Sequence, residues 1–108
     1  MKLLKNIGLP KKFSEADSGY SVDVDEEPNL IYETHLFETN LDFEAAIESL
    51  DAFLSKHYGE STKTRNEMSC VIVWKLNSQK ITTQISNLDG YVGGYINSQS
   101  DWIFNKTE

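Results

Sequence analysis

An amphipathic helix over residues 40–58 is the feature that most constrains the fold of this chain. Apolar side chains recur there every three or four positions, at Phe43, Ile47, Leu50, Leu54 and Tyr58. This spacing places them on one face of an α-helix, and that face must be buried against another layer. Thr39 and Asp42 have the spacing of a capping box and predict the start of the helix. Gly59 predicts the left-handed residue at which it ends.

Two strand segments precede this helix, within residues 20–38. Residues 20–25 alternate strictly between apolar and polar side chains, which is typical of a half-buried strand. Residues 30–38 are rich in strand formers, and the short connection over residues 26–29 predicts that the two segments pair. In the second strand we expect Leu30, Tyr32 and Leu36 to point inward, and Glu33 and His35 to point outward.

Three more strand segments follow the helix, within residues 68–97. Residues 68–76 contain the most apolar run of the chain, and residues 81–88 alternate again. Asp89-Gly90 is a strong signal for a two-residue hairpin turn into the last strand, over residues 91–97. The polar residues 59–67 are expected to form a loop.

This order of elements predicts an α+β fold. We expect an antiparallel sheet of about five strands (β-β-α-β-β-β) with one long helix packed on one face. The 108 residues suffice for a single domain. Residues 1–14 are expected to form an arm or short helix, residues 14–19 a loop, and residues 98–108 a C-terminal segment. The second face of the sheet carries Ser, Thr, Gln and acids, so we expect it to be open to solvent or to a partner.

The residue types present argue against several kinds of active site. A single cysteine, Cys70, allows no intrachain disulfide and no cysteine-based zinc site, and its apolar strand predicts a buried, unreactive thiol. No motif of a serine hydrolase, a zinc protease or a P-loop occurs. His35 and His57 lack the short spacing of metal ligands. We therefore expect a protein that is not an enzyme and that needs no cofactor and no metal.

Targeting signals are also weak in this sequence. Lys5 and Asn6 interrupt the apolar run at the start of the chain, which leaves no hydrophobic core of a signal peptide. No stretch approaches the roughly 18 apolar residues that a membrane helix needs. A cytoplasmic location and no contact with membranes are the resulting expectations.

The distribution of charge is the most unusual property of the sequence. The net charge is −7, and residues 13–55 contain twelve acids but no lysine or arginine. A field of one sign favours partners of the opposite sign, which argues for a basic protein and against direct binding of nucleic acid. We expect the partner-binding residues to be Asp23, Asp25, Glu26, Glu27, Glu44, Glu48 and Asp51. The alternative is that these acids only form a solvated surface.

The stretch over residues 43–50, the His57-Tyr58-Gly59 helix end and the strand with Trp74 together resemble small α+β immunity proteins of bacterial toxin–immunity pairs. The resemblance covers about residues 40–97 and is one of pattern rather than of a signature motif. It implies a cytoplasmic inhibitor that occludes the cationic site of one basic toxin or nuclease domain.

Two other functions remain open at this point. The first is a small-ligand-binding or subunit-interaction module that uses the open sheet face around Tyr91, Tyr95 and Trp102. The second is a small hydrolase built on His35 or His57 with nearby carboxylates. The sequence leaves open whether the protein is a monomer or a dimer.

Overall fold

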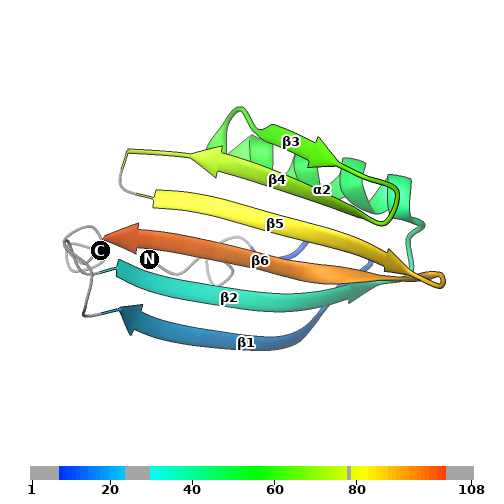
Figure 1. Ribbon diagram of the computed structural model, residues 1–108, viewed down its shortest axis with the longest axis horizontal. Coiled ribbons are helices and arrows are strands. Elements are labelled where there is room, and N and C mark those ends of the chain that lie inside the picture. Colours follow the sequence, from blue (N-terminus) through cyan, green and yellow to red (C-terminus); the bar gives the residue numbers. More distant parts are fainter. Residues whose placement is uncertain (1–7, 24–29, 78, 102–108) are drawn as a thin grey trace.

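The computed structural model describes residues 8–23, 30–77 and 79–101, and it shows one helix and six strands in these ranges (Figure 1). In chain order the elements are β1 (Phe13–Asp23), β2 (Leu30–Thr39), α2 (Phe43–Tyr58), β3 (Thr62–Arg65), β4 (Ser69–Lys75), β5 (Gln79–Leu88) and β6 (Tyr91–Asp101).

The six described strands form one antiparallel sheet with the order β1-β2-β6-β5-β4-β3. The last strand, β6, therefore lies in the middle of the sheet, between β2 and β5. Helix α2 packs on one face, where it contacts β4 and β5. Figure 1 shows the helix behind β3 and β4. The predicted α+β class is confirmed, with six strands where about five were expected.

The additional strand is β3, in the segment that we expected to be a loop. Its four residues are polar and all exposed, so no apolar alternation announces a strand. It pairs with β4 from Thr62 opposite Val73 to Arg65 opposite Cys70. Hydrophobic periodicity does not predict an edge strand of this kind, because the strand buries no apolar side chain.

Strand β1 begins at Phe13 rather than near residue 20, so the loop expected over residues 14–19 is wrong. These polar residues pair with β2, from Ser14 opposite Glu38 to Gly19 opposite Thr34. The register shifts between Glu15 and Asp17, which marks a β-bulge. Of the arm or short helix expected over residues 1–14 and the segment expected over residues 98–108, residues 1–7 and 102–108 lie outside the described residues. Residues 8–12 form no helix, and residues 98–101 extend β6 beyond its expected end at residue 97.

The helix is shorter than expected at its start. Asp42, and not Thr39, caps it, because the Asp42 carboxylate accepts a hydrogen bond of 2.8 Å from the Ala45 amide. The Thr39 hydroxyl accepts from the Leu41 amide instead and donates to the Lys12 carbonyl. Gly59 ends the helix as predicted, with a φ of 91° and its amide bonded to the Ser55 carbonyl.

The hairpin between β5 and β6 is confirmed at Asp89-Gly90. Both residues have positive φ, 53° and 85°. Positive φ at both central positions is the requirement of a type I′ turn, whose twist matches the flanking strands.

The core lies between α2 and the facing side of β4 and β5. Leu50 and Leu54 of the helix and Ile72, Trp74 and Ile81 of the sheet are completely buried. The Trp74 indole NH donates to the Ser55 hydroxyl at 3.1 Å, so the largest core side chain is also satisfied as a donor. Cys70 is buried in the same layer, as predicted, and this burial raises the pKa of its thiol. No helix in the described part of the chain is long and apolar enough to cross a membrane.

Candidate functional site

The acidic stripe of α2, formed by Glu44, Glu48 and Asp51, lies beside the edge strand β3. Arg65 of β3 reaches the Glu44 carboxylate with both terminal guanidinium nitrogens, one of them at 2.7 Å from Oε1. The same guanidinium lies 5.1 Å from the centre of the Phe43 ring. One cation therefore holds the first turn of the helix against the edge of the sheet.

The third acid of the stripe is fixed more firmly. Lys63 Nζ lies 2.9 Å from Asp51, and the hydroxyls of Ser55 and Ser61 donate to the same carboxylate at 3.0 and 2.9 Å. Burial alone would raise the pKa of Asp51, but the hydrogen bonds from Lys63, Ser61 and Ser55 and the Lys63 charge outweigh it and lower that pKa. The hydrogen bond to Asp51 in turn raises the pKa of Lys63.

Two cations of β3 lie beside this stripe in the folded protein. The gap in lysine and arginine along the sequence is closed in space by Lys63 and Arg65, which come after it. Glu44 and Asp51 are paired, and among the three acids only Glu48 is exposed with no ion pair among the described residues. The stripe is therefore largely neutralised by the protein itself.

The other predicted partner-binding acids are less well placed by the structure. Asp23 lies at the end of β1, opposite Leu30 of β2 in register. Asp25, Glu26 and Glu27 lie outside the described residues. The structure thus brings Glu44, Glu48 and Asp51 together on one helix and leaves their relation to the remaining four acids undefined.

We expect Asp51→Asn to lower the stability of the fold by about 1 kcal/mol at neutral pH, because a partly buried carboxylate loses its charge-assisted bonds. The folded-state pKa of Asp51 is lowered, so its contribution is complete above the ordinary value of 3.8 and is lost as the pH falls through the lowered pKa. Urea unfolding at neutral pH and in strong acid should show a difference that vanishes in acid. Glu60→Gln, at an exposed position, is the control. A difference that persists in acid would contradict this account.

The faces of β2 are the reverse of those predicted. Glu33, His35 and Phe37 point into the helix-covered side and are buried, whereas Leu36 is 44% exposed on the other side. The period of two was identified correctly, but the inward set was assigned to the wrong face. Alternation alone defines two faces and does not say which of them is covered.

The reversal creates a buried charged cluster. His35 Nδ1 lies 2.7 Å from Glu15 Oε2, and His35 Nε2 lies 2.5 Å from Glu33 Oε2. This arrangement fits the imidazolium form, in which both ring nitrogens donate. The other oxygen of Glu33, Oε1, is buried without a hydrogen-bond partner among the described residues. The two carboxylates bind opposite nitrogens of one ring, so they do not converge on a common point as metal ligands would.

No group of three His, Cys, Asp or Glu residues within the described ranges is arranged to hold a metal ion. His57, the second histidine considered for catalysis, is exposed near the end of α2 and packs against the Phe53 ring at 5.4 Å. His35 and His57 therefore have separate structural surroundings.

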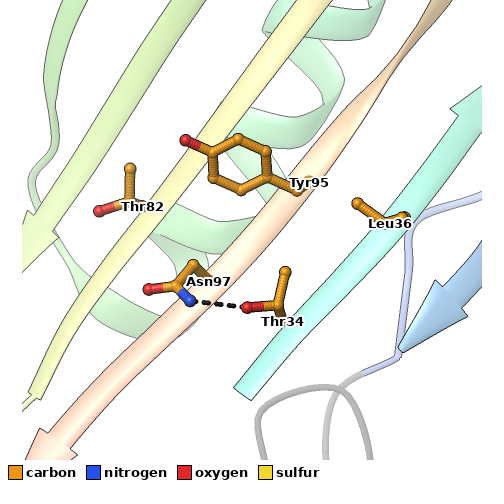
Figure 2. A pocket seen from close by; sticks show the side chains of 5 residues that line it. All are labelled: Thr34, Leu36, Thr82, Tyr95 and Asn97. Atoms are coloured by element: carbon orange, nitrogen blue, oxygen red, sulfur yellow. Dashed lines mark hydrogen bonds between the residues drawn. The ribbon is translucent and has the colours of Figure 1, made fainter. Parts of the chain in front are cut away.

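The sheet face opposite α2 carries a hollow of about 450 Å³ over β2, β5 and β6 (Figure 2). Two rows of cross-strand neighbours form it. Leu36 is paired with Tyr95 in one row, and Asn97 is paired with both Thr34 and Thr82 in the other. The Asn97 amide donates to the Thr34 hydroxyl at 2.8 Å, so these side chains are held in place. None of the residues that line the hollow is charged.

A second hollow, of about 340 Å³, lies where the β5–β6 turn meets the start of β1 and the end of β2. Tyr91, 56% exposed, donates to the Glu38 carboxylate at 2.8 Å beside it, and this bond raises the pKa of Tyr91. Lys12, at the same hollow, has a φ of 72°, which is unusual for a residue with a side chain. The lining is mainly polar and exposed.

No protein-family model, no curated protein and no solved structure matches this chain significantly.

The expected open face is present, and Tyr91 and Tyr95 lie on it as the alternative prediction had placed them. Trp102 is outside the described residues. Sequence reasoning missed Leu36 and Thr34, because Leu36 was assigned to the core. The available signal was the large apolar Phe37 next to Leu36: Phe37 is buried against Phe13 on the core face, and adjacent strand residues face opposite ways, so Leu36 faces the other side.

Proposed function

We propose that this chain is a non-catalytic binding protein for a basic protein partner, an immunity-type inhibitor that neutralises a toxin or nuclease domain by covering its cationic site. We further propose that the partner contacts the open sheet face rather than the acidic stripe of α2. The observation that carries the proposal is the hollow around Leu36 and Tyr95, which lies on the sheet face opposite the helix.

The surface of this face has the composition of a protein interface. Leu36 is about half exposed, at 44%, and the hydroxyl and amide side chains of Thr34, Thr82 and Asn97 line the same hollow. An apolar or aromatic anchor within a polar, hydrogen-bonding surround is the usual anatomy of a binding site. The Asn97 amide and the Thr34 hydroxyl are held by a bond to each other, so these two side chains lose little freedom on binding.

The charge of the chain supports a basic partner. The net charge is −7. The acidic stripe of α2 contributes little to the resulting negative field, because Lys63 pairs with Asp51 and Arg65 pairs with Glu44. A negative field over the whole molecule speeds the encounter with a positive protein, while the sheet face provides the contact itself.

We expect Leu36→Arg to weaken binding at least tenfold, which is about 1.4 kcal/mol, because it fills the hollow and places a positive charge against a basic partner. The partner is first recovered from the source cells and identified, and binding kinetics are then measured at low and high salt. Glu48→Gln is the matched control, since it changes the net charge by the same amount at an exposed position on α2. Its affinity should stay within about twofold of the unmodified protein.

Two results would count against the proposal. If Glu48→Gln weakens binding and Leu36→Arg does not, the helix surface is the interface. If the protein that binds tightly is acidic, or if no protein binds, the proposed function itself is wrong.

A further inference from the structure

We propose that the hollow around Tyr95 is a receptor for an arginine side chain of the basic partner, with the guanidinium stacked on the tyrosine ring. This inference rests on the proposed function and names the group that the open face recognises. It depends on the position of Tyr95, on the hydrogen-bonding groups beside it and on the charge around it.

The Tyr95 ring forms a flat platform. In Figure 2 the hollow is seen with α2 behind the sheet, and the ring extends from β6 across β5 with its face turned toward the viewer. Its hydroxyl donates to Gln84 Oε1 at 3.3 Å, and Leu36 is its cross-strand neighbour on the other side. The ring is therefore held at its tip and at its base, with one π-face available for stacking.

The neighbouring polar groups present acceptors to a ligand. Because the Asn97 NH2 group donates to Thr34, the Asn97 carbonyl oxygen is left as an acceptor at the hollow. The Thr82 hydroxyl, the next residue along this row, can accept as well. A guanidinium has five donors, no acceptor and a planar shape, so it fits an aromatic face that is bordered by oxygen acceptors.

The charges near the hollow favour a cation at one end. Glu38 is two residues from Leu36 on β2 and is exposed, which makes the Leu36 end the negative end. Lys80 is two residues from Thr82 on β5, at the opposite end. No lining residue carries a positive charge, so the hollow has no fixed partner for an anion. A guanidinium placed over Tyr95 lies one same-face row from Glu38 and two rows from Lys80, which satisfies this polarity.

Lysine is a poorer fit than arginine for the same hollow. Its ammonium group is compact and strongly hydrated, so stacking on a half-buried ring removes water that the hollow replaces only in part. The arginine side chain is more weakly hydrated and offers its flat face to the ring. The expected preference of the site is therefore arginine over lysine.

The test uses three capped tripeptides as probes, with arginine, lysine or citrulline between two glycines. Citrulline has nearly the shape of arginine and no charge. We expect the arginine peptide to shift the backbone amide NMR signals around Leu36, Tyr95 and Asn97, the lysine peptide to bind more weakly, and the citrulline peptide to leave these signals unchanged. Equal binding of citrulline, or of a neutral sugar such as methyl glucoside, would overturn the inference in favour of a site for neutral ligands.

Variants of two tyrosines on the same strand and face provide the control. Tyr95→Ala should raise the dissociation constant of the arginine peptide about two- to fivefold, the range expected for a cation–π contact at a surface. Tyr95→Phe keeps the ring and should bind as the unmodified protein does. Tyr91→Ala removes an exposed ring outside the hollow and should also leave binding unchanged. Equal loss in the Tyr91 and Tyr95 variants would contradict the assignment.

The two proposals fail in different ways. If Leu36→Arg abolishes partner binding and the arginine peptide does not shift the hollow, the arginine receptor is wrong and the open face remains the interface. If the arginine peptide binds at Tyr95 and the partner is insensitive to Leu36→Arg, the proposed function fails and the receptor stands.

Discussion

Gly94→Ala is expected to lower the stability of the fold by about 3 kcal/mol or more, because the added methyl group meets backbone that cannot move aside. Gly94 lies in the central strand, opposite Phe37 of β2 and Ile85 of β5. A Cβ at this position would lie 1.7 Å from the Gln84 carbonyl oxygen and 2.8 Å from the Gln84 carbonyl carbon. The strands must separate to admit it, and separation breaks the ladder on which both halves of the sheet depend.

Urea denaturation of the two proteins measures this effect. Gly93→Ala serves as a graded comparison, since its Cβ would lie 2.7 Å from the Phe37 carbonyl oxygen and needs a smaller shift. The expected order of stability is unmodified protein, then Gly93→Ala, then Gly94→Ala. A Gly94→Ala protein that unfolds at the same urea concentration as the unmodified chain would show that β6 is not packed this closely.

His35→Leu is expected to destabilise the protein by about 3–5 kcal/mol, since it removes the partner of a buried carboxylate. The side chains of Glu33 and His35 are each only 9% exposed, whereas Glu15 is 43% exposed. Without His35, the buried Glu33 carboxyl group loses the hydrogen bond between its Oε2 and His35 Nε2. Glu15 can turn to water, so Glu15→Gln should have a much smaller effect, about 1 kcal/mol or less.

A double variant separates the loss of the pair from the loss of packing. Combining Glu33→Met with His35→Leu replaces both charges with apolar groups, and we expect this protein to be more stable than His35→Leu alone. Thermal unfolding of the two single variants and the double variant gives the coupling energy. Strictly additive losses would mean that the short contact between Glu33 and His35 contributes no interaction to the fold.

The sequence predicted the elements of this fold whose conformation depends on neighbouring residues in the chain. The helix and its end at Gly59 follow from apolar spacing and from the conformational freedom of glycine. The Asp89-Gly90 turn follows from the preference of an Asp-Gly pair for a two-residue hairpin, and both residues have the positive φ that this turn needs. Strand β3 could not be predicted in this way. Lys63 and Arg65 bind acids of α2 from it, and such contacts depend on side chains 12 to 21 residues away along the chain.

The candidate site was harder to predict than the fold, because it depends on which face of β2 is covered. His35 looked like an exposed strand residue, and only its pairing with Glu15 and Glu33 explains why a charged side chain is buried. Leu36 looked like a core residue because it is apolar, but it lies on the face of β2 that the helix does not cover. Burying a charged side chain is costly unless partners offset the loss of hydration, and the sequence does not name those partners.

The acidic stripe illustrates the same limit for charge. Counting residues along the chain correctly found a stretch without lysine or arginine, and correctly placed Glu44, Glu48 and Asp51 on one helix. This count could not show that Lys63 and Arg65 of the edge strand β3 lie beside these acids in the folded protein. Charge along a sequence becomes a field only after folding has brought distant residues together.

The central position of β6 also governs how the sheet can assemble. Thr34 of β2 and Asn97 of β6 are bonded across a separation of 63 residues, so this half of the ladder closes a long loop and forms slowly. Before β6 is inserted, β2 and β5 each expose an unpaired edge ten residues long. Such edges pair readily with other chains, and aggregation during folding is therefore the characteristic hazard of this topology.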